Sequence, residues 1–236
     1  MTNSGGREDK KSRTRQQRRV KDTHRKLLNA ARDAFADKGL DYTTIDDITE
    51  RADVGKGTFY YHFSNKQEVI AELIDGLLNE LVKKIEQRCE GIGDLATLLD
   101  TVVKVHIDFF NGRWEDFVLF FQGRADLTLK VGYSGINQPF LKYLESIEKL
   151  VESVIKQRMP KTLLRRFGCA VAGFVSGYYS FAVIDSVDED VDKSLLEMRG
   201  AFVSSLTRFI NESLTPGQTQ RKQGEAIDSE AKPNKD

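Results

Sequence analysis

Proline and cysteine are both scarce in this chain of 236 residues, which has four prolines and two cysteines. Cys89 and Cys169 lie far apart, and no Cys-x-x-Cys pair or Cys/His cluster accompanies them, so we expect no metal site. Because prolines are few and the apolar periodicities are long, the sequence favours an all-α fold. The N-terminal end is polar and lacks the apolar core of a secretory signal. These features together predict a protein of the reducing cytoplasm.

Catalytic motifs are missing as well. The sequence contains no Gly-x-Ser-x-Gly, no phosphate-binding loop and no dinucleotide-binding fingerprint, so we expect neither an enzyme nor a cofactor. The three histidines are His24 at a helix start, His62 in a short helix and His106 on an apolar helix face. For His106, a hydrogen-bonded position in the core is a simpler interpretation than a catalytic or ligand-binding role.

The net charge of zero conceals a difference between the two ends of the chain. Residues 1–66 contain 15 Lys/Arg and 10 Asp/Glu, whereas residues 67–236 contain 21 and 26. A basic first part joined to an acidic remainder suggests that only the first part approaches nucleic acid. Residues 1–22 have no apolar period, which predicts a disordered basic arm. Its arginines are Arg13, Arg15, Arg18 and Arg19. They could contact DNA, at phosphates or in a minor groove, or they could belong to a solvated tail, and both interpretations stay open.

The stretch from Thr43 to Lys66 carries the strongest pattern in the chain. Thr44 is placed to cap a short helix, with Asp47 as its capping-box partner. A turn follows at residues 53–55, where a glycine can adopt a positive φ, and a second short helix covers residues 55–63. Two short helices joined by such a turn predict a helix-turn-helix, whose second helix enters the DNA major groove. The first helix has its apolar stripe at Ile45, Ile48 and Ala52, and the capping box predicted for the next helix is Ser64 with Gln67.

The first residues of the second helix are those that meet base edges in this motif. Lys56 can donate to guanine or phosphate, Gly57 lets the backbone come close, and Thr58 offers a hydroxyl and a methyl group. The tyrosines that follow can donate to phosphate oxygens, and Lys66 lies in a first helical turn, which also attracts phosphate. The predicted DNA-contacting residues are Thr44, Ile45, Gly55, Lys56, Gly57, Thr58, Tyr60, Tyr61, His62 and Lys66.

The run Phe59-Tyr60-Tyr61-His62-Phe63, followed three residues later by Lys66, resembles the DNA-binding domain of TetR-family bacterial transcription regulators. The resemblance covers roughly residues 22–70 and also includes Thr44, Ile48, Ala52, Val54 and Gly57. It implies an all-α chain, in which an N-terminal three-helix helix-turn-helix DNA-binding domain precedes a helical ligand-binding and dimerisation domain. Phe59 and Phe63, at i and i+4, are expected in the small core, and Tyr60 partly so.

Four segments follow from this pattern. They are a disordered basic arm at 1–22, the helix-turn-helix domain at 23–66, a helical effector-binding and dimerisation domain at 67–215 and a disordered tail at 216–236. Residues 123–137 contain few apolar residues and are expected to be loop-like in part. The remaining predicted helices cover 23–38, 65–88, 94–111, 114–122, 138–158, 161–184 and 190–214.

Aromatic residues gather in the middle of the chain. An aromatic-lined cavity inside a helical bundle is a usual site for a small molecule, and the family resemblance implies one here. The alternative is ordinary core packing, while Arg124 is a candidate partner for an anionic group. The predicted effector-pocket residues are Phe110, Trp114, Phe117, Phe121, Arg124, Tyr133, Phe140, Tyr143, Phe174 and Tyr178.

Residues 167–184 contain no charged side chain. The length is borderline for a membrane span, but serines and tyrosines dilute the hydrophobicity, and a fully buried helix has the same pattern. With the last helix it is our candidate for a four-helix dimer interface, as the resemblance implies; the alternative is closure of the monomer core. The predicted interface residues are Gly173, Gly177, Phe181, Met198, Phe202 and Phe209.

Together these features predict a homodimeric regulator that binds a palindromic double-stranded DNA operator. We expect a repressor that a small apolar or amphipathic effector releases from DNA. One alternative is the same fold controlled by a protein partner without an effector. A second, from another class, is a helical lipid-binding protein or enzyme, which would bind DNA without sequence preference or not at all.

Overall fold

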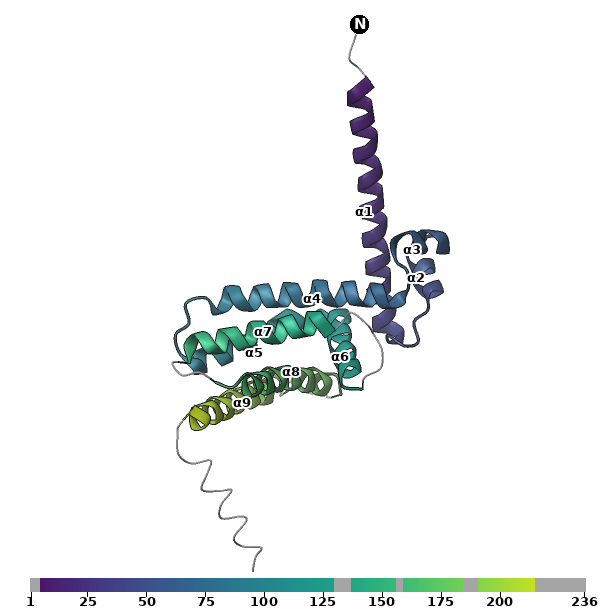
Figure 1. Ribbon diagram of the computed structural model, residues 1–236. Helices are drawn as coiled ribbons and strands as arrows, with labels where there is room; N and C mark the ends of the chain where they lie inside the picture. Colours follow the sequence, from purple (N-terminus) through teal and green to yellow (C-terminus); the bar gives the residue numbers. More distant parts are fainter. Residues whose placement is uncertain (1–4, 130–136, 156–158, 185–190, 215–236) are drawn as a thin grey trace, which may run out of the picture. The chain divides into compact units, whose positions relative to one another are not determined.

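The computed structural model describes residues 5–129, 137–155, 159–184 and 191–214, and the side chains of 15–123, 137–155, 159–177 and 198–212. These residues form nine α-helices and no strand, which confirms the predicted all-α class (Figure 1). The helices are α1 Gly5–Lys38, α2 Ile45–Arg51, α3 Lys56–His62, α4 Lys66–Cys89, α5 Leu95–Phe110, α6 Trp114–Leu129, α7 Asn137–Val154, α8 Lys161–Ile184 and α9 Val191–Leu214.

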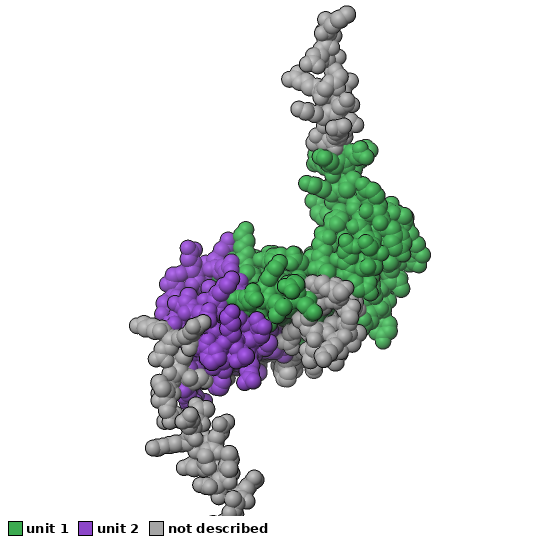
Figure 2. Space-filling view, viewed as in Figure 1, with its two compact units in different colours: residues 1–85, 106–145 green, residues 86–105, 146–236 purple. Residues whose placement is uncertain are grey.

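The chain divides into two compact units (Figure 2). The first unit contains residues 1–85 and 106–145, and the second contains residues 86–105 and 146–236. The predicted boundary lay at residues 66 and 67, whereas the first unit also includes most of α4, all of α6 and part of α7. The reason is that α6 packs along α1, so the helix-turn-helix is built into a larger helical unit.

Helix α1 differs from the prediction at its beginning. We expected disorder up to residue 22 and a helix from Thr23, but the helix begins at Gly5. Residues 5–22 contain no proline and many Arg, Lys and Gln, all good helix formers, and they extend a helix that is already nucleated. A missing apolar period therefore does not exclude a helix. Helix α1 ends as predicted, since Gly39 follows its last residue with a φ of +83°.

The turn between α2 and α3 is also built differently from the prediction. Asp53 adopts the positive φ, at 53°, whereas Gly55 has φ −75° and ψ 154° and is the N-cap of α3. An aspartate tolerates the left-handed region because its side chain is short and polar. Gly55 is extended because an N-cap residue requires non-helical backbone.

The cap of α4 lies one residue later than predicted. The predicted box joined Ser64 and Gln67, but Asn65 Oδ1 accepts from the Glu68 amide at 2.9 Å. The Glu68 carboxylate in turn accepts from the Ser64 amide at 2.6 Å. The sequence offers overlapping candidate caps here, and the register is decided by where α4 packs, with Val69 and Ile70 fully buried.

Helix α6 is longer than predicted, because Gly123 continues the helix instead of ending it. Gly123 is buried, and a Cβ on it would lie 2.6 Å from Ile74 Cδ1 and 3.5 Å from the Phe140 ring. The glycine therefore lets α4, α6 and α7 pack closely within the first unit. Residues 123–129 of the predicted loop-like segment 123–137 therefore belong to α6, and its residues 130–136 lie outside the described part. Helix α7 ends at Val154, short of the predicted 158, and residues 156–158 and the predicted tail at 216–236 also lie outside the described part.

Helix α8 covers the predicted range, and α9 begins one residue after its predicted start. Within the second unit, Arg165 of α8 donates to Glu148 of α7 at 3.2 Å. The rings of Phe174 and Phe202 stack with centroids 4.2 Å apart, which joins α8 to α9. Among the described residues, no helix is both long and apolar enough to cross a membrane.

Candidate nucleic-acid interface

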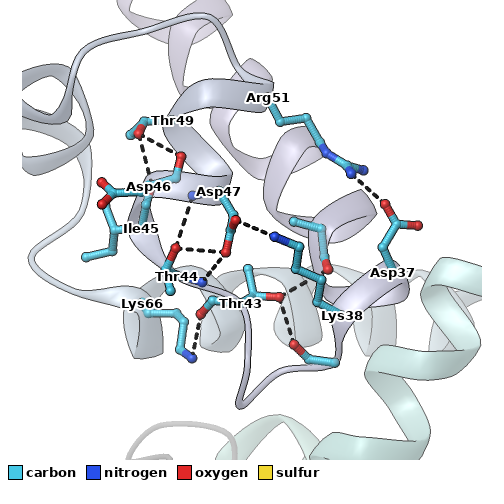
Figure 3. Close-up of polar contacts among 12 residues, drawn as sticks. Asp37, Lys38, Thr43, Thr44, Ile45, Asp46, Asp47, Thr49, Arg51 and Lys66 are labelled. Carbon is cyan, nitrogen blue, oxygen red and sulfur yellow. Dashed lines mark hydrogen bonds and ion pairs between the residues drawn. The ribbon is translucent and has the colours of Figure 1, made fainter.

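The first short helix of the motif, α2, is fixed at its start by a hydrogen-bond network (Figure 3). The Thr44 hydroxyl accepts from the Asp47 amide at 3.2 Å, and the Asp47 carboxylate accepts from the Thr44 amide at 2.8 Å, which confirms the predicted capping box. Lys38 of α1 also donates to Asp47, so the pKa of this carboxyl lies well below its usual range, first because of Lys38 and then because of Thr44. The network holds α2 against the end of α1.

The second short helix, α3, has only seven residues and depends on its apolar side for support. Phe59 and Phe63 are buried, as predicted, with ring centroids 5.7 Å apart. Ile48 of α2 is also fully buried. Two rings and one aliphatic side chain thus fix both helices, which leaves the remaining side of α3 available.

The residues predicted to meet DNA are mostly exposed. Lys56 and Gly57 are exposed, Thr58 is half-buried, and Tyr60 and Tyr61 are 56% and 71% exposed. At the predicted Gly55 and at Gly57, no heavy atom lies within 4 Å of a would-be Cβ, so a phosphate or base can approach the backbone closely. Thr44 is exposed and Ile45 half-buried at the start of α2.

Lys56 is occupied by a neighbouring carboxylate in the structure. Its Nζ lies 2.7 Å from Asp46 Oδ1, and this hydrogen bond raises the pKa of Lys56. Both side chains are well exposed, and exposed ion pairs are weak. A phosphate or a guanine acceptor can therefore replace Asp46 at little cost.

Lys66 has a different environment from the one predicted. Its Nζ donates to three backbone carbonyls, of Leu40 at 2.7 Å, Asp41 at 3.0 Å and Thr43 at 2.8 Å. An ammonium group has three donors, and all three are used, so the predicted phosphate contact is not available in this arrangement. Desolvation lowers the pKa of Lys66. The residue joins the start of α4 to the loop between α1 and α2.

His62 closes the end of α3 against α1. It is half-buried, and its ring lies 5.4 Å from His24, which stacks on Phe63 and forms a 2.7 Å hydrogen bond with Glu72 of α4. Desolvation, and secondarily the charge of His24, lower the pKa of His62. The imidazole is therefore neutral near pH 7 and lies among protein groups, unlike the two tyrosines before it.

Two residues at this interface were not among those predicted. Tyr42, in the loop before α2, is 83% exposed, and the only signal for it in the sequence is an aromatic residue two positions before the N-cap. Gln122 of α6 accepts from the Leu40 amide at 2.8 Å. Because 82 residues separate the two partners, no local pattern could reveal this contact.

Comparison with known proteins now bears on this geometry. A sequence profile described as "Bacterial regulatory proteins, tetR family" matches residues 27–73, which include α2, α3 and the start of α4. The regulator YvdT of Bacillus subtilis is 32% identical over 124 residues, covering 52% of this chain and 64% of YvdT. The chain belongs to the TetR family. The aligned part spans just under two thirds of the length of YvdT.

Other similar proteins match a larger share of the chain. The TetC protein of transposon Tn10 from Escherichia coli is 21% identical over 83% of this chain and 94% of its own length. The structure of FadR from Bacillus subtilis in complex with stearoyl-CoA matches with a TM-score of 0.61 over 77% of this chain and 96% of FadR, at 18% identity. A TetR-family structure from Shewanella matches with a TM-score of 0.64, over 79% of this chain and 96% of its own, also at 18% identity. At such identities the structures establish the fold.

The predicted effector residues of this TetR-family chain divide into several groups. Phe110, Phe117, Phe140 and Tyr143 are buried in the first unit, and Phe120, absent from the predicted set, touches three of them with centroids 5.1–6.0 Å apart. Trp114 and Phe121 are partly exposed and flank Phe117. Phe174 belongs to the second unit, while Tyr133 and the side chains of Arg124 and Tyr178 lie outside the described part.

The aromatic cluster of the first unit also contains a buried polar pair. His106 is 0% exposed, and its Nε2 lies 2.7 Å from the Tyr143 hydroxyl. This confirms the expectation of a hydrogen-bonded core histidine. Among the described side chains, no group of His, Cys, Asp and Glu residues is arranged to hold a metal ion.

The predicted dimer residues include several exposed apolar groups. Met198 and Phe209 of α9 are 53% and 50% exposed, and Gly177 of α8 is exposed with no heavy atom within 4 Å of a would-be Cβ. Gly173 and Phe202 are half-buried, and the side chain of Phe181 lies outside the described part. Part of the surface of Met198 and Phe209 is thus exposed on α9, and Gly177 is exposed on α8.

Proposed function

We propose that this TetR-family chain is a transcriptional regulator that reads DNA with α3. The observation that carries the proposal is the exposed set of donors on a helix whose other side is fixed by Phe59 and Phe63. Lys56 and Thr58 suit base edges, and the two tyrosines suit phosphate oxygens. The relatives are named as transcriptional regulators, which agrees with a binding protein rather than an enzyme.

We further propose that the regulator acts as a homodimer on a palindromic operator. Exposed Met198, Phe209 and Gly177 support this, since large apolar side chains exposed on neighbouring helices mark interaction surfaces. A dimer that presents two copies of α3 fits half-sites separated by about one helical turn, roughly 34 Å. An isologous interface formed by α8 and α9 would give a four-helix contact.

The operator proposal is tested by selection from a randomised duplex pool, with the full chain as the bait. We expect an enriched inverted repeat. Tyr61→Ala should then weaken binding to that repeat about tenfold, because one charge-assisted hydrogen bond to phosphate is lost. Lys83→Gln, at an exposed position of α4, is the control and should bind as the unaltered chain does. A pool without any enriched sequence would contradict the regulator proposal.

The effector in our proposal is a small apolar or amphipathic molecule that releases a repressor from DNA. The relative KstR2 of Rhodococcus jostii is named a repressor, and the matching FadR structure contains stearoyl-CoA. An effector shifts DNA affinity only as far as its own affinities for the two conformations differ. Gln122 and Lys66 provide contacts through which α6 and α4 can displace the loop before α2.

Titration of long-chain acyl-CoAs into an operator complex tests the effector class. Release that depends on chain length would support an amphipathic effector. If no acyl-CoA alters binding to a confirmed operator, control by another class of effector or by a protein partner is favoured. The operator selection does not depend on this result, so the two proposals can fail separately.

A further inference from the structure

The positive charge of the N-terminal part is confined to one segment of α1. Residues 5–22, here called the basic extension, contain eight Lys/Arg and three Asp/Glu. Residues 23–66 contain seven of each, so the helix-turn-helix itself has no net charge. The whole excess of five positive charges in residues 1–66 therefore belongs to the basic extension. Attraction to DNA at long range depends on such an excess.

The cations of the helix-turn-helix are also engaged within the protein. Between residues 38 and 66 there are four Lys/Arg side chains. Three of them form ion pairs, and the fourth, Lys66, donates only to backbone carbonyls. The pairs are Lys38 with Asp47, Arg51 with Asp37 and Lys56 with Asp46. In the free protein, residues 38–66 thus present few unpaired positive charges, although a phosphate can replace Asp46 in the exposed pair with Lys56.

The basic extension differs in this respect. Arg15, Arg18 and Arg19 are exposed, and no described acidic side chain forms an ion pair with any of them. They follow one another at i, i+3 and i+4, so they lie on one face of α1. Lys26, also exposed, continues this face toward the packed part of the helix. Asp22 lies close in sequence but is bonded to Arg25.

The extension is a continuous helix rather than a flexible arm. At about 1.5 Å per residue, its 18 residues cover roughly 27 Å. Figure 1 shows α1 continuing well past α2 and α3, which belong to the same unit. A helix fixes the spacing of its charges in advance, so less conformational entropy is lost when they meet a row of phosphates.

We propose that the basic extension is a second DNA-binding element, which contacts the phosphate backbone of the duplex outside the bases read by α3. The proposal rests on the proposed DNA-binding function and gives separate roles to the basic extension and to α3. The extension supplies salt-dependent affinity for any sequence, and α3 supplies sequence preference. The partner is double-stranded DNA, whose regularly spaced phosphates complement a linear row of cations.

The test measures binding of the full chain to a short random-sequence duplex as a function of salt concentration. The variant is the triple substitution Arg15→Gln, Arg18→Gln and Arg19→Gln. We expect the slope of log K against log salt to become shallower by about 2.7, because each lost phosphate contact contributes about 0.9. The factor by which affinity falls between about 50 and 200 mM salt should then be roughly 40-fold smaller for the variant than for the unaltered chain.

The matched control removes three positive charges at exposed positions elsewhere, by Lys83→Gln, Lys104→Gln and Lys142→Gln. It has the same net charge as the variant and should retain the slope of the unaltered chain. Equal slopes for variant and control would overturn the proposal. All substituted side chains are exposed on helices, so circular dichroism should report the same helicity in each chain.

The outcome can be separated from that of the proposed function by adding the selected operator to the same experiment. If the unaltered chain prefers its operator and the triple variant keeps that preference with a shallower slope, both proposals stand. If the preference is present but the slope is unchanged, only the extension proposal fails. If the unaltered chain has no preference for any sequence, the regulator proposal fails.

Discussion

At the scale of single residues, the proposed DNA-binding surface carries ion pairs as well as exposed donors. Asp46 holds Lys56 at 2.7 Å and places a negative charge where phosphate would approach. The sequence predicted Lys56 as a DNA contact but gave no sign that Asp46 of α2 would form an ion pair with it. If Lys56 contacts DNA as we propose, it exchanges the Asp46 carboxylate for a group of the DNA on binding.

The first prediction concerns this exchange. Asp46→Asn should strengthen operator binding roughly two- to fivefold, because a weak exposed ion pair no longer competes for Lys56. Fluorescence anisotropy on the selected operator measures this. Asp53→Asn, an exposed neighbour that lies in the turn, is the comparison. An unchanged or weaker affinity in Asp46→Asn would mean that Lys56 does not contact DNA.

The second prediction concerns His62, whose pKa is lowered from the ordinary 6.5 by desolvation and by the charge of His24. Just below pH 6.5, His62 binds a proton in the unfolded chain but stays neutral in the folded chain. The stability from His62 is therefore complete above pH 6.5 and is lost as the pH falls through its folded pKa. The groups facing it are His24 and, through His24, Glu72.

His62→Asn removes this proton uptake. We expect its free energy of unfolding, measured with urea, to fall less between about pH 7 and pH 5 than that of the unaltered chain. Above pH 7 the two unfolding free energies should change with pH in parallel, because the side chain at position 62 is neutral in both chains. Parallel curves across the whole range would show that the imidazole is solvated in the folded protein.

At the scale of elements, the close approach of α4, α6 and α7 depends on one glycine. A Cβ at Gly123 would lie 2.6 Å from Ile74 Cδ1, closer than side chains normally come. Helix α6 also reaches the loop before α2 through Gln122, so its position affects how that loop is held. The packing at Gly123 therefore affects the position of α6 and, through Gln122, the loop that precedes the helix-turn-helix in the same unit.

The third prediction tests this packing. Gly123→Ala should destabilise the chain by about 1 kcal/mol, because overpacking exceeds the gain in helix propensity. In an Ile74→Val background, which removes Cδ1, Gly123→Ala should lower the free energy of unfolding only slightly. The double-mutant cycle, measured by thermal or urea unfolding, should then give a coupling energy of about 1 kcal/mol. Gly76→Ala is the control and should stabilise, since nothing lies within 4 Å of its would-be Cβ. Additive effects of the first pair would contradict the contact.

At the scale of the whole molecule, assembly is the open structural prediction. Gly177 and the side chains of Met198 and Phe209 are exposed on α8 and α9. Gly177→Leu adds bulk at a position where no described heavy atom lies within 4 Å of a would-be Cβ, so the fold should remain intact. A dimer through α8 should dissociate, and sedimentation velocity would then report a monomer.

Gly76→Leu is the matched control for this experiment, because Gly76 is an exposed helical glycine of α4 with equally free surroundings. It should leave the assembly unchanged. A dimer that survives Gly177→Leu would exclude close packing of α8 against its copy. Dissociation of both variants would indicate a general loss of stability instead of a specific interface.

The sequence by itself determined the features that depend on neighbours three or four residues apart. The capping box of Thr44 and Asp47 and the buried pair Phe59 and Phe63 were predicted from such spacings. The range of α8 was predicted around the uncharged run of residues 167–184. Local hydrogen bonds and helical periodicity involve residues that are close in the chain, so the pattern of residue types carries the information.

Only the tertiary structure decided which distant groups meet. The bonds of Lys66 to the loop before α2, of Gln122 to Leu40 and of His106 to Tyr143 join residues 23 to 82 positions apart. The same holds for Gly123, whose role depends on Ile74. These partners are chosen by how helices pack, and a single sequence does not encode that packing in any short-range pattern. The observed contacts of Lys66 and the helical position of Gly123 therefore differ from those that their local sequence suggested.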